Sequence, residues 1–458
     1  MRFRKSEIVS KVHSIPDIKF ENQGLTSFSG LVLFQIFFQR INFAKKLKKI
    51  FSHQKSSSFY GLHKIFLVLI VNTLLGYRKL RDVEWYSEDP LVKRVLGLGK
   101  LPDPSTVSRN LNQMDFQSVI NLRNENREIN LDRLEKEHLK RITVDFDGSV
   151  LSTGKAAEGA AVGYNRKKKG QRSYYPLYCT IAQTGQVFDV YHRPGNVHDS
   201  NGALEFAQSC LTEIKLLNPQ AIIEVRMDSA FFSEEMVKLL KGLGVEFTIS
   251  VPFERYTFLK EKVENRKRWR EIDEEWSFFE EDWSPKCWDK SERFLLIRHK
   301  VKVQQKGPIQ LDLFIPYEQG YTFKVILTNK TSRPKNILNF HNGRGTQEKI
   351  FAELKTDGGM DYVPVRTLAG NQAFLMSKIM THNLIREMQM DIQEKDRGTT
   401  YKRAAHWVFE SLNTFRQKII QRSGRLTSPQ GKLTLTMNGS LAFEENFKKI
   451  YQGLQVAA

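Results

Sequence analysis

The sequence predicts an α/β fold in which a mixed β-sheet has helices on its faces and follows a mainly helical N-terminal region. Three observations support this prediction. Residues 1–110 contain apolar stretches with helical spacing, such as the one that begins at Leu31. From residue 141 onward, short apolar segments alternate with helical patterns, which is typical of a sheet packed against helices. Between residues 252 and 335 the alternation stops, and the sequence is rich in aromatic and charged residues.

The composition indicates a folded, strongly basic protein. The 458 residues include 71 Lys and Arg against 51 Asp and Glu, a formal net charge of +20. At about 100–200 residues per domain, this length predicts two to four domains. A hydrophobic content of 40 % excludes a wholly disordered chain. The positive charge favours a polyanionic partner, and nucleic acid is the first candidate.

Apolar runs and cysteines bound the cellular setting. The longest apolar run, Ile65–Leu75, has 11 residues, short of the roughly 20 that a membrane span needs. The N-terminus has no apolar segment of the signal-peptide type. Cys179, Cys210 and Cys287 are widely spaced, which excludes a disulfide framework and a CxxC zinc site. We therefore expect a cytoplasmic protein with no membrane contact, in which Cys179 and Cys210 are buried.

The N-terminal region is predicted to be helical and to bind DNA. Residues 1–110 contain 19 Lys and Arg and 8 Asp and Glu, so 19 − 8 = +11 of the net charge lies there. In the segment Leu101–Leu111, Pro104 suits a first helical turn and Arg109 an outer face. This pattern is typical of the second helix of a helix-turn-helix, which reads DNA. A capped surface helix is the alternative.

The remaining elements follow in chain order. We expect strands at 142–147, 177–182, 186–191, 221–227 and 245–251, with helices at 202–217 and 234–243. The segment 252–335 is predicted to be a β-rich insertion with late strands at 309–315 and 321–328. Helices are predicted at 344–356, 371–390 and 401–422. Four tryptophans are expected to form the core of the insertion, and stacking on an unpaired DNA base is the alternative: Trp269, Trp276, Trp283 and Trp288.

These elements divide the chain into five parts. The predicted parts are an N-terminal helical DNA-binding region (1–135), a first part of the core (136–251), the β-rich insertion (252–335), a second part of the core (336–395) and a C-terminal helical region (396–458).

Two aspartates end predicted strands of the core. Asp147 is followed by Gly148 and Ser149, and Asp228 is followed by Ser229. Functional groups gather at strand ends in open α/β sheets. If the two strands are neighbours, both carboxylates enter one crevice, and their repulsion favours divalent cations such as Mg²⁺ between them. A helix-cap or turn role is the alternative for each aspartate.

Two further acidic residues enter the same set. Asp145 lies two residues before Asp147 and so on the same face of the strand, which makes it a second candidate. In the predicted helix after Arg344, Glu348 lies at about 40° and Lys355 at about 20° from Arg344 around the axis. One stripe of the helix thus presents a cation, a carboxylate and a second cation. A surface helix with i,i+4 ion pairs is the alternative.

Taken together, these motifs resemble the DDE transposases of bacterial insertion sequences. The resemblance rests on Asp147-Gly-Ser, on Arg-Met-Asp228-Ser and on the spacing Arg344-x3-Glu348-x6-Lys355. It covers roughly residues 95–390 and is closest to the 1380-type branch. Further matching segments are Val144-Asp-Phe-Asp-Gly-Ser149, Gly163-Tyr-Asn-Arg-Lys-Lys-Lys-Gly170, Arg193-Pro-Gly-Asn196, Phe340-His-Asn-Gly-Arg-Gly-Thr346 and Asn383-Leu384.

The resemblance implies an RNase H-like catalytic core and a two-metal-ion site. Asp147, Asp228 and Glu348 would hold two Mg²⁺ ions, for which Mn²⁺ substitutes, while Arg344 and Lys355 contact DNA. The implied activity is hydrolysis at the terminal inverted repeats of the element and transfer of the 3′-OH ends to target DNA. A homodimer associated with the bacterial nucleoid is implied as well. A metal-dependent nuclease without strand transfer and a catalytically idle DNA-binding regulator are the alternatives.

Basic and histidine residues complete the candidate site. His341 departs from the family pattern, which usually has Tyr three positions before the Arg, and is a possible accessory residue. His198 is another, with a turn histidine as the alternative. A basic loop flanked by Tyr164, Tyr174 and Tyr175 is expected to bind DNA phosphates, although such a loop can also be only solvated. Its cations are Arg166, Lys167, Lys168, Lys169 and Arg172.

Overall fold

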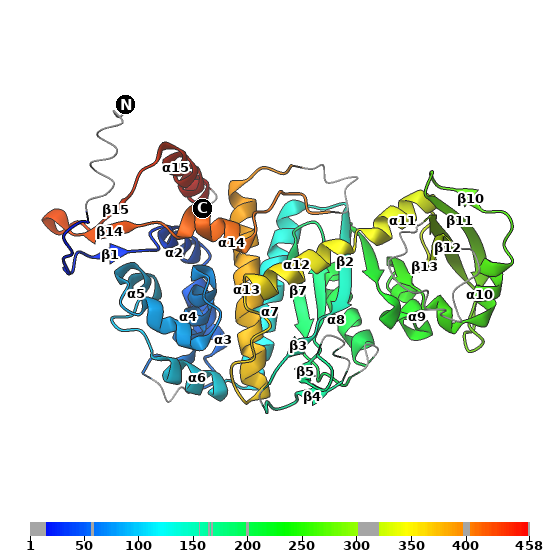
Figure 1. Ribbon diagram of the computed structural model, residues 1–458, viewed down its shortest axis with the longest axis horizontal. Helices are drawn as coiled ribbons and strands as arrows, with labels where there is room; N and C mark the ends of the chain where they lie inside the picture. The colour runs from blue at the N-terminus through cyan, green and yellow to red at the C-terminus, as the bar shows by residue number, and fades with distance from the viewer. Residues whose placement is uncertain are drawn as a thin grey trace.

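The computed structural model describes residues 15–55, 59–154, 156–163, 165, 168–197, 201–300, 320–396 and 404–456. Within these residues the largest unit is a nine-stranded mixed sheet with the order β10-β11-β12-β13-β9-β8-β2-β6-β7 (Figure 1). Its strands are β2 (Arg141–Gly148), β6 (Leu177–Ile181), β7 (Gln186–Tyr191), β8 (Ile222–Met227), β9 (Glu246–Ser250), β10 (Arg270–Glu271), β11 (Trp276–Trp283), β12 (Glu292–Lys300) and β13 (Tyr321–Thr328).

The centre of the sheet confirms the predicted α/β core. β2 runs parallel to β8 and antiparallel to β6, and β8 runs parallel to β9. Ile142, Val144 and Phe146 of β2 are completely buried, because helices cover the sheet on both faces and apolar side chains lose their contact with water there. The strands predicted from 142 to 251 and at 321–328 are all present. The strand predicted at 309–315 lies outside the described residues.

The β-rich insertion is present, and its strands continue the core sheet. β13 pairs antiparallel with β9, with Ile326 opposite Ser250. Trp269, Trp283 and Trp288 are partly buried against the same core as the central strands. Trp276 packs on a smaller cluster and stacks on His299, with 4.1 Å between the ring centroids. The tryptophans therefore pack as core residues, as predicted.

Helices pack on and around the sheet. α13 (Leu368–Ile392) is mostly buried and connects the N-terminal helices to the sheet (Figure 1). It contacts α4 (Leu62–Leu75), α6 (Pro104–Gln113), α7 (Phe116–Glu137) and α15 (Leu441–Val456). The helices of this part are α7 (Phe116–Glu137), α8 (Ala203–Leu217), α9 (Glu234–Gly242), α10 (Thr257–Glu264), α11 (Pro334–Asn342), α12 (Gly345–Thr356) and α13 (Leu368–Ile392). Cys179 and Cys210 are buried, as predicted, and Cys287 is exposed.

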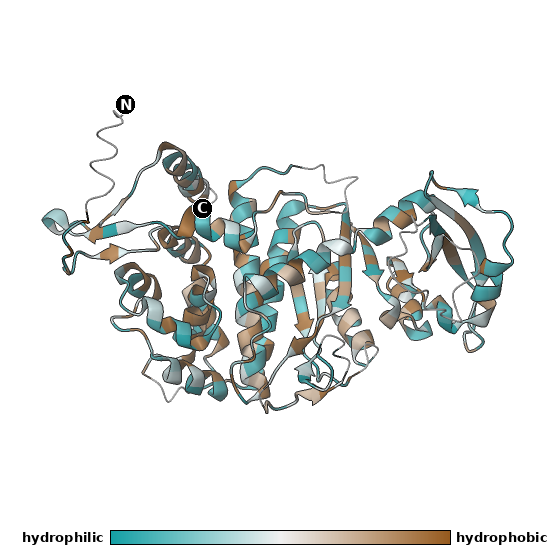
Figure 2. Ribbon diagram, in the orientation of Figure 1, coloured by the Kyte–Doolittle hydropathy of each residue, from teal (hydrophilic) through white to brown (hydrophobic). Residues whose placement is uncertain are grey.

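The N-terminal region is helical, as predicted. It consists of α2 (Leu31–Arg40), α3 (Phe43–Ile50), α4 (Leu62–Leu75), the 3₁₀-helix η1 (Leu80–Tyr86), α5 (Pro90–Leu96) and α6 (Pro104–Gln113). The apolar run found in the sequence forms α4, which is buried nearly all round and is brown in Figure 2. Asp103 caps α6, since its carboxylate accepts a hydrogen bond from the Thr106 amide at 2.8 Å. In the described part of the chain, no helix is long and apolar enough to cross a membrane.

The C-terminal region differs from the prediction. A helix over 401–422 is wrong for residues 404–411, which are irregular; helix begins only at α14 (Leu412–Phe415) and continues as a π-helix over 416–420. The backbone of this stretch bonds elsewhere: the His406 amide donates to the Gln183 carbonyl, and the Glu410 amide to the Gln389 side chain. These long-range bonds replace the i→i−4 bonds of a helix.

Strands also occur within 396–458, where only helix is predicted. β14 (Gly424–Thr427) and β15 (Thr434–Met437) form a small sheet with β1 (Leu25–Thr26), and α15 (Leu441–Val456) follows. A further small sheet follows β2 directly in the chain and consists of β3 (Leu151–Ser152), β4 (Ala161–Val162) and β5 (Arg172–Tyr174).

Candidate catalytic site

Asp147 and Asp228 lie at the same end of two neighbouring parallel strands. The register of β2 and β8 places Phe146 opposite Met227. The residue that follows Phe146 is Asp147, and the residue that follows Met227 is Asp228. Asp147 accepts a hydrogen bond from the Gly148 amide at 2.8 Å, and Asp228 accepts one from the Ala230 amide at 3.0 Å. Both side chains are partly exposed, at 17 % and 29 %. The condition set by the sequence, that the two strands are neighbours, is therefore met.

The guanidinium of Arg344 lies between the two carboxylates. Its Nη1 is 3.5 Å from Asp147 Oδ2 and 3.9 Å from Asp228 Oδ2. This nitrogen is buried and makes no hydrogen bond with the described residues. Two carboxylates that converge on one cation repel each other, and a positive charge between them lowers the free energy of the ionised pair.

Glu348 lies one helical turn beyond Arg344, in the first turn of α12. Residues four apart on a helix share a face, with about 5–6 Å between their Cβ atoms. The Glu348 side chain is exposed. Across the described ranges, no three His, Cys, Asp or Glu side chains form a group that could hold a metal ion. The structure thus brings Asp147 and Asp228 together, with Glu348 outside ligand distance.

Asp145 is engaged in a buried ion pair. Its carboxylate accepts from Arg226 Nε at 2.5 Å and from Nη2 at 2.7 Å, and both side chains are almost inaccessible to solvent. Burial raises the pKa of Asp145, while Arg226 and then Arg344 oppose this shift. Because both of its oxygens bond to Arg226, Asp145 is held in the buried ion pair, whereas Asp147 is partly exposed and lies beside Arg344.

His341 is buried and contacts β9 through both ring nitrogens. It lies at the end of α11, where Nε2 is 2.8 Å from Ser250 Oγ and Nδ1 is 3.0 Å from Thr248 Oγ1, both on β9. Burial, followed by the charges of the nearby Lys324 and Arg344, lowers the pKa of His341 to about 3. A neutral imidazole therefore connects α11 to β9, and the structure does not present this residue to a DNA end.

This arrangement predicts an acid-sensitive stability. The folded pKa of His341 is about 3 against 6.5 for an unperturbed histidine, so its contribution is fully present above pH 6.5 and is lost as pH falls toward 3. His192 and His382 have pKa values lowered in the same direction, chiefly by burial. We expect urea unfolding of His341→Asn to show a shallower loss of stability between pH 7 and 5 than the wild type. An equally steep loss in both would contradict this assignment.

The other predicted DNA contacts that the structure describes lie on α6, on α12 and at the start of β5 or just before it. Lys355 is on α12 about 16 Å along the axis from Arg344, at 1.5 Å per residue. Arg109 is exposed on α6, with Nη2 3.1 Å from Thr106 Oγ1. Lys168 and Lys169 are exposed, and Arg172 begins β5. The remaining members of the predicted set lie outside the described residues: Tyr164, Arg166, Lys167 and His198.

An aromatic ring stands beside the first aspartate. A Cβ at residue 148 would lie 2.6 Å from the Cζ of Tyr175, so only glycine allows this ring to approach the backbone next to Asp147. Tyr175 also packs against Arg193, whose guanidinium carbon is 5.5 Å from the ring centroid. The Gly148-Ser149 exit of the strand therefore has a packing reason in addition to the turn.

Two residues near the site are not identified from the sequence. Lys324 of β13 donates a hydrogen bond to Asn342 Oδ1 at 2.9 Å, and burial, followed by the charge of Arg344, lowers its pKa. Arg226 is the partner of Asp145. The available signal for Arg226 is its offset, since it precedes Asp228 by two residues as Asp145 precedes Asp147.

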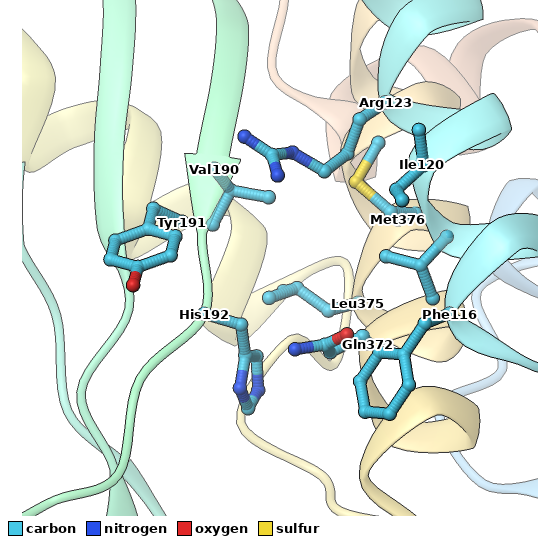
Figure 3. A pocket seen from close by; sticks show the side chains of 10 residues that line it. Phe116, Ile120, Arg123, Val190, Tyr191, His192, Gln372, Leu375 and Met376 are labelled. Atoms are coloured by element: carbon cyan, nitrogen blue, oxygen red, sulfur yellow. The ribbon is translucent and has the colours of Figure 1, made fainter. Parts of the chain in front are cut away.

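A pocket of about 170 Å³ lies on the face of the sheet to which Asp147 belongs (Figure 3). Its Val190 belongs to the cross-strand row in which Asp147 pairs with Tyr178 and Tyr178 pairs with Val190. Residues of α7, β7 and α13 line it, and their side chains are mostly apolar. The pocket therefore lies at β7, two strands away from Asp147 on β2, and neither Asp147 nor Asp228 lines it.

Comparison with known proteins gives one extensive match. The family model described as transposase DDE domain group 1 matches residues 11–458. No curated protein matches the chain.

Some solved structures show weaker similarity. The piggyBac transposase synaptic complex with hairpin DNA is 13 % identical over 81 % of this chain and 78 % of that chain, with a TM-score of 0.39. The Mos1 transposase paired-end complex with left transposon end is 12 % identical over 43 % and 60 %, with a TM-score of 0.18. The Mos1 mariner paired end complex with Mn is 12 % identical over 53 % and 70 %, with a TM-score of 0.17.

Proposed function

Because the chain belongs to the transposase DDE domain group 1 family, we propose that it cuts DNA at the ends of an insertion sequence and joins the freed 3′-OH ends to target DNA. The observation that supports this proposal most directly is the pair Asp147 and Asp228 around Arg344, at the ends of two neighbouring parallel strands. The proposal includes an RNase H-like core and a place in the 1380-type branch of bacterial insertion sequences, with action at the nucleoid.

The residues present fit divalent metal ions. Asp147 and Asp228 offer hard oxygen ligands of the kind that Mg²⁺ and Mn²⁺ prefer. The guanidinium between them shows that this position accommodates positive charge. Glu348 is exposed on the face of α12 that also carries Arg344. Its side chain makes no hydrogen bond or ion pair with the described residues, so it can turn toward Asp147 and Asp228. We propose these three carboxylates as the metal ligands.

In the proposed reaction, the carboxylates would hold the metal ions and the basic side chains would bind DNA. Two bound metal ions would supply Lewis acidity toward the attacking water or 3′-OH and positive charge toward the leaving oxygen. Asp147, Asp228 and Glu348 hold and orient them. Arg344, displaced from between the carboxylates, binds a phosphate oxygen at the cut, which its planar guanidinium suits. Lys355 lies too far along α12 to reach the same phosphate and is proposed to bind the backbone beyond it.

DNA affinity would come from the basic surface. The exposed Lys168, Lys169 and Arg172 and the exposed Arg109 on α6 are proposed to contact phosphates, together with the basic N-terminal region. Contacts of this kind give affinity that falls with salt. Since two element ends must be cut and joined together, we propose that a homodimer pairs them.

A cleavage assay tests the proposal. The substrate is a DNA duplex that carries the inverted repeat found beside the coding region, incubated with Mg²⁺, with Mn²⁺ or with EDTA. We expect cuts at the repeat end only with metal, and joined products when target DNA is added. Cuts without joined products would identify a nuclease. Binding without any cut would identify a DNA-binding regulator and contradict the proposal.

A further inference from the structure

A buried ion pair lies on the two strands that carry Asp147 and Asp228, two residues before each aspartate. Asp145 on β2 and Arg226 on β8 face each other in the parallel register. Asp145 precedes Asp147 by two residues, and Arg226 precedes Asp228 by two residues. Residues two apart on a strand share a face, so each member of the ion pair lies on the same face as the aspartate that follows it. The pair is bidentate, with 2.5 and 2.7 Å between the bonded atoms, and both side chains have exposures of 1 % or less.

Arg226 also contacts the turn that leads into α12. Its Nη1 donates a hydrogen bond to the Phe340 carbonyl at 3.1 Å, and its guanidinium carbon is 5.3 Å from the centroid of the Phe340 ring. A Cβ at Gly343 would lie 2.2 Å from the same Nη1. The backbone between α11 and α12 therefore closes on the guanidinium, immediately before Arg344.

Asp145 contacts the first turn of α12 through its backbone. Its carbonyl accepts a hydrogen bond from Gln347 Nε2 at 3.1 Å, and Gln347 is buried. Gln347 stands between Arg344 and Glu348 in the chain. The pair thus joins β2, β8, α11 and α12 at one point.

We propose that Arg226 and Asp145 are positioning residues that set where Arg344 and Glu348 lie relative to Asp147 and Asp228. This inference rests on the proposed function. The pair touches neither substrate nor metal, so it acts on metal affinity and on kcat and leaves DNA binding unchanged. Lysine cannot replace arginine here, because a single ammonium cannot bond both carboxylate oxygens and the carbonyl in the fixed geometry of the guanidinium.

The test compares Arg226→Lys with the wild type in the full chain. Partners behind metal ligands typically change metal affinity or activity by about 10–100-fold when substituted. We expect a loss in this range for Mn²⁺ affinity, measured by electron paramagnetic resonance without DNA. We also expect kcat to fall, and the Mg²⁺ concentration for half-maximal cleavage to rise, while the Kd for DNA stays the same.

Arg133→Lys is the matched control. Arg133 on α7 is also buried, and its Nη2 lies 2.6 Å from Glu387 Oε2 and 2.6 Å from Asp391 Oδ1. Its substitution removes the same kind of contact from another part of the fold, so it should lower the Tm without changing Mn²⁺ affinity. If Arg226→Lys lowers the Tm but retains the Mn²⁺ affinity of the wild type, the inference is overturned.

Gly343→Ala covers the case in which Arg226→Lys does not fold. Its methyl group would press on the guanidinium while the ion pair keeps its charges, and weaker Mn²⁺ binding by this variant supports the inference. Unchanged Mn²⁺ binding overturns it. Because Mn²⁺ binding is measured without DNA, the result is separate from the proposed function, which fails if the wild type does not both cut the repeat end and join it to target DNA.

Discussion

Asp147→Asn and Asp228→Asn are each expected to lower DNA cleavage by roughly 10³-fold or more, equal to about 4 kcal/mol of transition-state stabilisation. Each substitution keeps the size of the side chain and removes the negative charge that would hold a metal ion. The two aspartates lie 3.5 and 3.9 Å from the same Nη1 of Arg344, so a single substitution leaves one carboxylate at a site proposed to need both. Single-turnover cleavage of a repeat-end duplex with Mg²⁺ measures the effect.

DNA binding provides the internal comparison. Loss of a carboxylate from a basic surface should leave DNA affinity unchanged or slightly higher. Glu348→Gln should behave like the two aspartate variants, because it removes the third proposed ligand. Asp282→Asn, at an exposed position of β11, changes the net charge equally and should cleave normally. Wild-type cleavage by Asp147→Asn or Asp228→Asn would refute the assignment of the site.

Lys378→Met is expected to stabilise the protein by a few kcal/mol near pH 7. Lys378 is completely buried in α13, where Nζ donates to Thr73 Oγ1 at 2.7 Å and lies 4.5 Å from the Phe374 ring centroid. Burial, followed by the charge of the neighbouring Arg416, lowers its pKa from 10.5 to about 7. Methionine fills a similar volume without a charge, and Thr73 keeps its bond to the Leu69 carbonyl at 2.9 Å.

The sign of the pH dependence follows from the lowered pKa. The unfolded chain binds a proton at Lys378 below pH 10.5, and the folded protein does so only below about 7. The contribution of Lys378 to the stability of the wild type therefore falls as pH drops from 10.5 to 7 and is level below that. Urea unfolding at pH 7, 8 and 9 should show this slope in the wild type and a smaller slope in Lys378→Met.

An exposed lysine gives the control. Lys418→Met removes a lysine that is 56 % exposed and should leave the slope unchanged. A Lys378→Met variant that is less stable than the wild type at pH 7 would show that the hydrogen bond to Thr73 outweighs the cost of burial.

Local patterns predict the elements of the core well. The strands at 186–191 and 321–328 have the predicted bounds, because apolar runs bounded by turn residues depend on neighbours in the chain. The helix predicted at 401–422 fails over 404–411, where the backbone is held by the distant Gln183 and Gln389. Bonds to distant residues leave no periodic signal in the sequence.

The candidate site shows the same division. The position of Asp147 and Asp228 at strand ends follows from the apolar strands before them, and their proximity depends on the pairing of β2 with β8. The helical spacing places Arg344 and Glu348 on one stripe, but only the packing of α12 puts the guanidinium between the aspartates. The burial of His341 against β9 likewise depends on a contact between distant segments.

The continuous sheet has a mechanical consequence. Since β13 is hydrogen-bonded to β9 and β9 to β8, a hinge motion of the outer strands against the core would strain the short β13–β9 ladder. A displacement of β11 or β12 would be transmitted through β13 and β9 to β8, and Asp228 follows directly after β8. The edge of the sheet that is farthest from β7 is thus connected to the position of Asp228 by continuous backbone hydrogen bonding (Figure 1).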